Sequence, residues 1–184
     1  MEQAAVTPQT RAVPICVKRL GYNIAAEISG VDLSKSVDGA QFDAINHALL
    51  ENEIVVFRGQ DITPEQFMDF GRTFGELTVS PFSPTHDDTP ELIILDNHKD
   101  NPPRLTDNWH SDETFRETPP KATMLHSLIT PAIGGDTMFA SMTAAYDGLN
   151  PALQEFYANL EAINDFKVFR ALYQGTYEGR KKLV

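Results

Sequence analysis

The sequence has a single cysteine, Cys16, so no disulfide can form within the chain. Cys16 stands between Ile15 and Val17 in a strand-like run. A free thiol among apolar neighbours usually packs as a small hydrophobic side chain. We therefore expect Cys16 to be buried and structural, not catalytic.

Long apolar runs are also missing. The longest, residues 54–57 and 92–95, fall far short of the roughly 20 apolar residues that span a bilayer. The first 14 residues show neither the basic nor the apolar segment of a secretory signal. We therefore expect a cytoplasmic protein with no membrane partner.

Positive charge is scarce. There are 15 Lys and Arg against 26 Asp and Glu, which gives a formal net charge of -11. This sign opposes binding to a phosphate backbone, so we expect no nucleic-acid partner. A glycine-rich phosphate loop of the dinucleotide or nucleotide type is absent as well.

Neither an internal repeat nor a Gly/Ser linker divides the chain. We therefore expect one domain over residues 13–184, preceded by a loose arm at residues 1–12. Several predicted strands are mixed with helices, without a regular alternation of strand and crossover helix. This pattern predicts an α+β protein built on an antiparallel sheet.

The first half of the chain predicts a hairpin, two helices and a strand. Residues 15–17 and 24–28 have strand character, and Gly21 between them allows a turn. Phe42, Ile45 and Leu49 recur at helical spacing, and residues 53–59 then predict a buried strand. A second helix follows, with clear boundary signals. Thr63 can cap it, Pro64 suits its first position, Gln66 completes a capping box, and Gly75 can end it.

The second half predicts three strands and a helix. The strands lie at residues 91–97, 121–129 and 136–141. Asn150 and Pro151 open the helix. Its apolar face comprises Leu153, Phe156, Tyr157, Leu160 and Ile163.

Histidine separated by one residue from aspartate can place an imidazole and a carboxylate on the same side of an extended segment. The pairs are His86/Asp88, His98/Asp100 and His110/Asp112, so spacing alone does not select one. The first two lie in polar loops typical of solvated turns. Only the third has large apolar neighbours, Trp109 and Phe115, which could hold a metal pair rigidly. A histidine that fills a core next to Trp109 is the alternative interpretation.

The segment Gly134-Gly135-Asp136-Thr137 allows a tight backbone turn before a strand. A turn without any functional role would also explain these two glycines. The hydroxyl of Thr137 could also donate to a carboxylate.

Several segments recur together in a known order: FGEL (74–77), LDNHKDNPP (95–103), DNWHSDETFRETPP (107–120), GGDT (134–137) and AAYDGL (144–149). With IAAEISGVDLS (24–34) and IVVFRGQDITPEQ (54–66), they resemble the taurine dioxygenase family of iron(II)- and 2-oxoglutarate-dependent dioxygenases. The resemblance runs from about Val17 to Phe166.

The resemblance implies a double-stranded β-helix, a jelly-roll barrel with flanking helices. It also implies Fe(II), 2-oxoglutarate and O2 as cofactor and co-substrates, and a role in taurine catabolism or similar chemistry. His110 and Asp112 match the first two iron ligands, and Thr137 matches the residue that contacts a 2-oxoglutarate carboxylate. Asn108 and Trp109 match neighbours in the motif without a defined role. His126 does not match the third ligand, so we expect it to be structural.

The sequence departs from the family at two places. The distal histidine ligand and the 2-oxoglutarate-binding arginine would lie beyond Val184, so we expect a chain with an incomplete barrel and site. Ser80 and Ser83 stand where taurine-binding members have histidine and tyrosine, and Thr106 stands in place of an asparagine. We therefore expect a small anionic substrate related to taurine, bound near these three residues.

Two other functions stay open at this point. One is a non-catalytic barrel that acts as an interaction module, and self-association into a homo-oligomer is compatible with either function. The other is a zinc hydrolase, because histidine and carboxylate also suit zinc.

Overall fold

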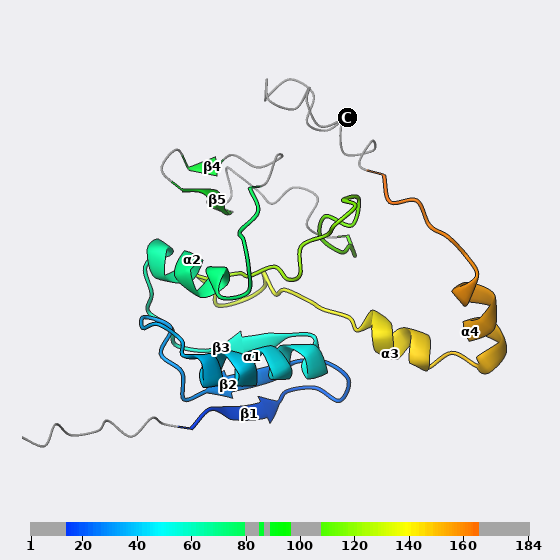
Figure 1. Ribbon diagram of the computed structural model, residues 1–184, viewed down its shortest axis with the longest axis horizontal. Helices are drawn as coiled ribbons and strands as arrows, with labels where there is room; N and C mark the ends of the chain where they lie inside the picture. The colour runs from blue at the N-terminus through cyan, green and yellow to red at the C-terminus, as the bar shows by residue number, and fades with distance from the viewer. Residues whose placement is uncertain (1–13, 80–84, 87–88, 97–107, 166–184) are drawn as a thin grey trace, which may run out of the picture. The chain divides into compact units, whose positions relative to one another are not determined.

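The computed structural model describes residues 14–79, 85–86, 89–96 and 108–165 (Figure 1). The chain forms two compact units. The first contains strands β1 to β3, helix α1 and the segment Met138–Tyr146. The second contains helix α2, strands β4 and β5, the segment that ends at Thr137, and helix α4. The predicted arm at residues 1–12 lies outside the described residues.

The first unit begins with the predicted hairpin. Strands β1 (Cys16–Arg19) and β2 (Ala26–Ser29) pair antiparallel, with Val17 opposite Ile28. The prediction that Cys16 is buried was wrong, because its side chain is exposed. The sheet order is β1-β2-β3, so β1 is an edge strand, and all four of its residues are exposed.

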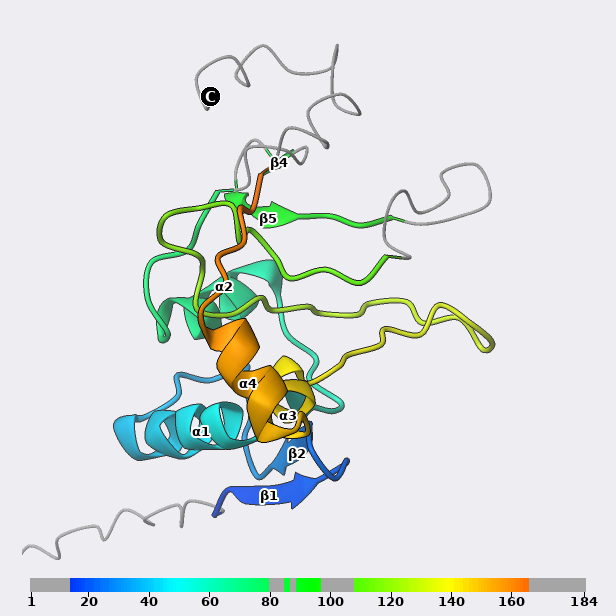
Figure 2. The same cartoon turned by 90° about the vertical axis from the view of Figure 1, so that its right-hand side faces the viewer.

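Helix α1 (Gly39–Asn52) connects β2 to β3 (Val55–Phe57), as the periodicity predicted. Asp38 and Gln41 form a capping box at its start. Strand β3 pairs with β2 in parallel, so the expectation of an antiparallel sheet was wrong for this pair of strands. The physical reason is that α1 is a crossover helix, which returns the chain to the sheet in the same direction. Figures 1 and 2 show α1 lying along this sheet.

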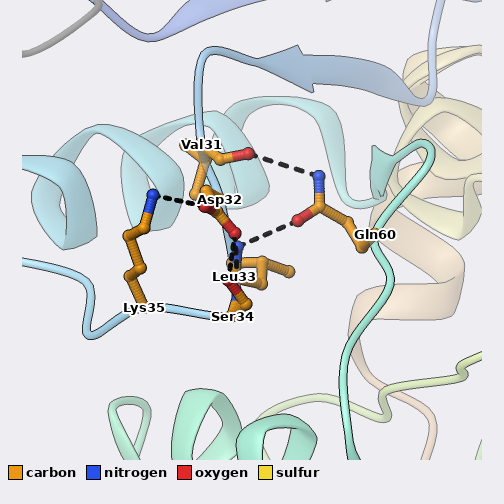
Figure 3. A network of polar contacts seen from close by, with 6 residues as sticks. All are labelled: Val31, Asp32, Leu33, Ser34, Lys35 and Gln60. Carbon is orange, nitrogen blue, oxygen red and sulfur yellow. Dashed lines mark hydrogen bonds and ion pairs between the residues drawn. The ribbon is translucent and has the colours of Figure 1, made fainter.

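The core of the first unit lies between α1 and the sheet. Its buried apolar residues are Ala26, Ile28, Leu33, Ile45 and Ala48. The side chain of Gln60 is hydrogen-bonded to the backbone of the loop after β2 (Figure 3). Gln60 accepts from the backbone N–H of Leu33 at 2.9 Å and donates to the carbonyl of Val31 at 3.2 Å.

The same loop contains a charged cluster. Lys35 Nζ lies 2.7 Å from Asp32 Oδ2, and both the hydroxyl and the backbone N–H of Ser34 donate to Asp32 Oδ1 (Figure 3). The bond from Lys35, followed by those from Ser34, lowers the pKa of Asp32 from 3.8 to about 2. The loop is therefore ordered by local polar contacts at its exposed side.

The second unit begins with α2 (Pro64–Arg72), and its predicted capping box is confirmed. Thr63 Oγ1 accepts from the N–H of Gln66, and Gln66 Oε1 accepts from the N–H of Thr63 at 2.8 Å. The hydrogen bond from its own backbone N–H, followed by the one from the Thr63 side chain, lowers the pKa of Glu65 in the first turn. The helix ends at Arg72, three residues before Gly75.

Strands β4 (Thr85–His86) and β5 (Thr89–Ile93) form a two-stranded antiparallel sheet, and α2 contacts β5. The predicted strand at 91–97 is thus confirmed only in its first part. The prediction of strands at 121–129 and 136–141 was wrong, because neither segment has a paired partner among the described residues. Strand character in a sequence becomes a strand only where a neighbour supplies the hydrogen bonds. The described residues contain a mixed sheet and helices, and they contain no closed barrel.

Two further helices follow. Helix α3 (Met142–Asp147) was not predicted, whereas α4 (Pro151–Ala158) was, and Asn150 caps α4 by accepting from the N–H of Leu153. The apolar face of α4 is exposed: Phe156 by 58% and Leu160, just beyond the helix, by 55%. Among the described residues, no helix has the length and apolar character needed to cross a membrane.

Candidate metal site

His110 and Asp112 come together in the second unit, in the segment between β5 and α3. His110 Nε2 lies 3.2 Å from Asp112 Oδ1. The side chains are 56% and 47% exposed, so solvent and small ions reach the pair. The alternative of a histidine that fills a core is therefore wrong. Trp109, expected as a rigid apolar neighbour, is also 69% exposed.

The backbone of Asn108 orients the imidazole. His110 Nδ1 lies 2.8 Å from the carbonyl oxygen of Asn108. A carbonyl oxygen can only accept, so Nδ1 carries the proton, and in the neutral ring Nε2 presents its lone pair. Metal-binding histidines usually have their second nitrogen fixed in this way. The tautomer is therefore the one in which Nε2 can ligate a metal.

The carboxylate of Asp112 is held from its other side. Thr123 Oγ1 donates to Asp112 Oδ2 at 2.7 Å, which leaves Oδ1 facing His110. Nε2 of a neutral imidazole and a carboxylate oxygen both carry lone pairs, so two atoms 3.2 Å apart can donate to one cation. The pair is thus a site that attracts positive charge.

The donor atoms fit a non-haem iron(II) ion. Such ions are held by two histidines and one carboxylate on one face of an octahedron. Two neighbouring ligand atoms that each lie about 2.1 Å from one ion at a right angle are about 3.0 Å apart. The observed 3.2 Å is close to this edge. Within the described ranges no group of three potential ligands converges, so His110 and Asp112 supply two donors.

The chain turns sharply just after Asp112. Glu113 has φ +48°, a left-handed conformation that is rare for residues other than glycine. Arg116 pairs with the Glu113 carboxylate, and its N–H bonds the Glu113 carbonyl at 3.0 Å. Thr114 donates to Asn164 Oδ1 at 3.3 Å and so links this turn to the segment after α4. These contacts fix the direction in which Asp112 leaves the backbone.

Thr137 follows a glycine turn, with Asp136 between Gly135 and Thr137. Gly134 and Gly135 have φ +77° and +74°, values that residues other than glycine rarely adopt. The side chain of Thr137 is exposed. In the part of the chain that the structure describes, no hydrogen bond connects Thr137 to His110 or Asp112, so its role stays a prediction.

Other sequence predictions have different outcomes. Ser80, Ser83, Thr106 and the pair His98/Asp100 lie outside the described residues. His126 was expected to be structural, and its ring packs 5.6 Å from the ring of Phe67 in α2.

Thr123 was missed by the sequence analysis. It lies in the segment 121–129, where side chains alternate between two sides of an extended chain. Met124 and His126 are half-buried and Thr123 is exposed, which matches that alternation. The alternation could have separated Thr123 from its packed neighbours, but nothing in the sequence pairs it with Asp112.

Residues 16–182 match the family described as taurine catabolism dioxygenase TauD, TfdA. The chain belongs to this family. It is 36% identical over 165 residues to an alpha-ketoglutarate-dependent sulfate ester dioxygenase of Pseudomonas putida, covering 89% of this chain and 54% of that protein. It is 31% identical over 162 residues to an alpha-ketoglutarate-dependent sulfonate dioxygenase of Saccharomyces cerevisiae, covering 82% and 39%. Alpha-ketoglutarate is another name for 2-oxoglutarate.

The fold is similar to that of solved family members. A taurine dioxygenase from Burkholderia xenovorans superposes with a TM-score of 0.70 at 35% identity, over 79% of this chain and 51% of that one. The chain spans about half the length of the first two curated relatives that it matches. The predicted membership of the taurine dioxygenase family is confirmed. The family's members are oxidoreductases that use Fe(II), 2-oxoglutarate and O2.

Proposed function

We propose that this chain carries two iron ligands, His110 and Asp112, of an iron(II)- and 2-oxoglutarate-dependent dioxygenase. The observation that carries the proposal is the pairing of His110 Nε2 with Asp112 Oδ1 at 3.2 Å, in a His-x-Asp sequence within the segment that matches the family. Asn108 fixes the required tautomer, and both side chains are open to solvent. Iron(II), 2-oxoglutarate and oxygen together would supply oxidative decarboxylation to succinate and hydroxylation of a substrate carbon.

The complete site needs further groups. We propose that the third ligand and a 2-oxoglutarate-binding arginine belong to the part of the relatives' length that this chain does not span. Thr137 would donate its hydroxyl to a 2-oxoglutarate carboxylate, and the glycine turn before it would let the co-substrate approach the backbone. The described strands would then be part of a double-stranded β-helix. A cytoplasmic location agrees with this function.

We propose a small organic anion of the sulfate ester or sulfonate class as the substrate. The names of relatives support this class, since they act on sulfate esters and sulfonates. Ser80, Ser83 and Thr106 would contribute hydroxyl donors in place of the side chains that bind taurine. Hydroxyl groups bind an anionic oxygen without adding charge. A sulfate ester is therefore favoured over taurine itself.

The test is succinate release by the protein produced from its native gene. With Fe(II), 2-oxoglutarate and oxygen, we expect succinate release that depends on an alkyl sulfate ester or an alkanesulfonate and is slower with taurine. Asp112→Asn should abolish it, whereas Asp43→Asn, an exposed carboxylate on α1, should leave it unchanged. Hydrolysis with zinc in the absence of oxygen would support the hydrolase instead. No turnover with any member of the panel would support a binding module.

A further inference from the structure

We propose that Thr123 is a positioning residue for Asp112. The inference rests on the proposed function in one respect, which is that Asp112 ligates the metal. Thr123 Oγ1 donates to Asp112 Oδ2 at 2.7 Å, while Asp112 Oδ1 faces His110 Nε2 at 3.2 Å. Oδ2 of the carboxylate therefore accepts the hydrogen bond from Thr123, and Oδ1 is free to bind a metal beside His110.

The hydrogen bond selects one orientation of a group that otherwise turns easily. Rotation about the last bond of an aspartate side chain has a broad energy profile. Asp112 is 47% exposed, so packing alone does not stop this rotation. A bond from a neutral hydroxyl to an ionised carboxylate is charge-assisted and short, as this one is. Thr123 thus holds Oδ1 towards His110 before any ion binds.

Thr123 is itself held by the packing of its neighbours. Met124 and His126, one and three residues after Thr123, are half-buried, and the ring of His126 lies 5.6 Å from the ring of Phe67. Met124 packs so closely against α2 that a Cβ at Gly71 would lie 2.5 Å from Met124 Cε. Side chains alternate along an extended segment, so Thr123 points to the opposite side. Helix α2 therefore supports the hydroxyl at a fixed place in the second unit.

The contact also restricts how the carboxylate can coordinate a metal. With Oδ2 bonded to Thr123, Asp112 binds through Oδ1 alone. A carboxylate that bound through both oxygens would take a second coordination position. Three single protein donors leave three positions of an octahedral ion for co-substrates. Thr123 thereby keeps a position open that 2-oxoglutarate needs.

The experiment measures Mn(II) affinity of the 184-residue chain by electron paramagnetic resonance, without turnover. Loss of a group that supports a ligand typically weakens metal binding 10- to 100-fold. We expect Thr123→Val, which keeps the shape and removes the hydroxyl, to weaken binding by about that factor. Thr123→Ser should restore nearly the original affinity. Thr130→Val removes a hydroxyl that lies 2.9 Å from the hydroxyl of Ser127 instead, and it should leave the Mn(II) affinity unchanged.

A second readout separates positioning from general damage. The 13C chemical shift of the Asp112 carboxyl should change in Thr123→Val without metal, while the urea midpoint of unfolding stays the same. Unchanged Mn(II) affinity in Thr123→Val would overturn the inference, as would equal weakening in Thr123→Val and Thr123→Ser. If Asp112→Asn also binds Mn(II) normally, the ligand assignment in the proposed function is the part that fails.

Discussion

His110 Nε2 and Asp112 Oδ1 lie 3.2 Å apart, although both side chains are about half exposed to solvent. An exposed ion pair contributes at most about 1 kcal/mol to folding, so this geometry is not explained by stability. The chain offers a matched comparison: His47 Nε2 lies 3.3 Å from Glu51 Oε1 on the exposed side of α1. The two pairs have similar distances. Among the contacts of the described residues, only the first pair has a tautomer fixed by a backbone carbonyl and a carboxylate held by a hydroxyl.

Replacing His110 with alanine should remove metal binding with little effect on stability. We expect Mn(II) affinity to fall at least 10-fold, because one of two ligands is lost, while the free energy of unfolding changes by less than about 1 kcal/mol. Calorimetric titration with Mn(II) and urea denaturation measure the two quantities. His47→Ala is the control, and we expect it to leave Mn(II) affinity unchanged. A similar loss of affinity in both variants would mean that binding is a general effect of exposed histidines.

The capping box at the start of α2 should contribute measurably to the stability of the second unit. Thr63→Ala removes the acceptor for the N–H of Gln66 and should lower the free energy of unfolding by about 1 kcal/mol. Thr63→Ser keeps the acceptor oxygen and should retain most of this stabilisation. Urea denaturation followed by circular dichroism measures the difference. Equal stability of the alanine and wild-type chains would show that water replaces the cap.

The parts of this fold that the sequence predicts are local. The capping box of α2 depends on residues three apart, and the spacing of Phe42, Ile45 and Leu49 predicts α1 through one periodicity. The hairpin needs only Gly21 and its flanking residues. Each of these predictions is confirmed.

The parts that the sequence does not predict depend on distant partners. Three features depend on which strand lies beside which: the parallel pairing of β2 with β3, the exposure of Cys16 on an edge strand, and the lack of strand pairing for 121–129 and 136–141 among the described residues. At the candidate site, the apolar neighbours and the family resemblance selected His110 and Asp112 from three His-x-Asp pairs. The bond from Thr123 crosses 11 residues and no periodicity reveals it.

The side chain of Gln60 should protect the loop after β2 from local opening. Gln60→Ala leaves the N–H of Leu33 and the carbonyl of Val31 without this partner, and amide hydrogen exchange at Leu33 should become about 5- to 30-fold faster, the equivalent of about 1–2 kcal/mol. Gln60→Glu keeps an acceptor for Leu33 and loses the donor to Val31. We expect it to retain most of the protection at Leu33. Exchange at Leu33 that is equally fast in both variants would contradict this account.

Acid should remove the stabilising contacts of Asp32 in the loop 31–35 only at very low pH. The pKa of Asp32 is lowered to about 2, so its contribution to stability is present above pH 3.8 and is lost as the pH falls through about 2. Lys35→Met removes the main cause and should raise the pKa of Asp32 towards 3.8. An NMR titration of the Asp32 carboxyl carbon measures both values. Lys18→Met on β1 is the control, and a normal pKa for Asp32 in the wild-type chain would refute the contact.

Site-resolved metal binding distinguishes the three His-x-Asp pairs of the sequence, of which only His110/Asp112 is proposed to bind the metal. Mn(II) added in small amounts broadens the NMR signals of nuclei close to the bound ion. We predict that the ring signals of His110 broaden first, together with the carboxyl signal of Asp112, while His47 and His126 stay sharp. Broadening that begins at His86 or His98, or equally at every histidine, would contradict the assignment of His110 and Asp112 as the metal ligands.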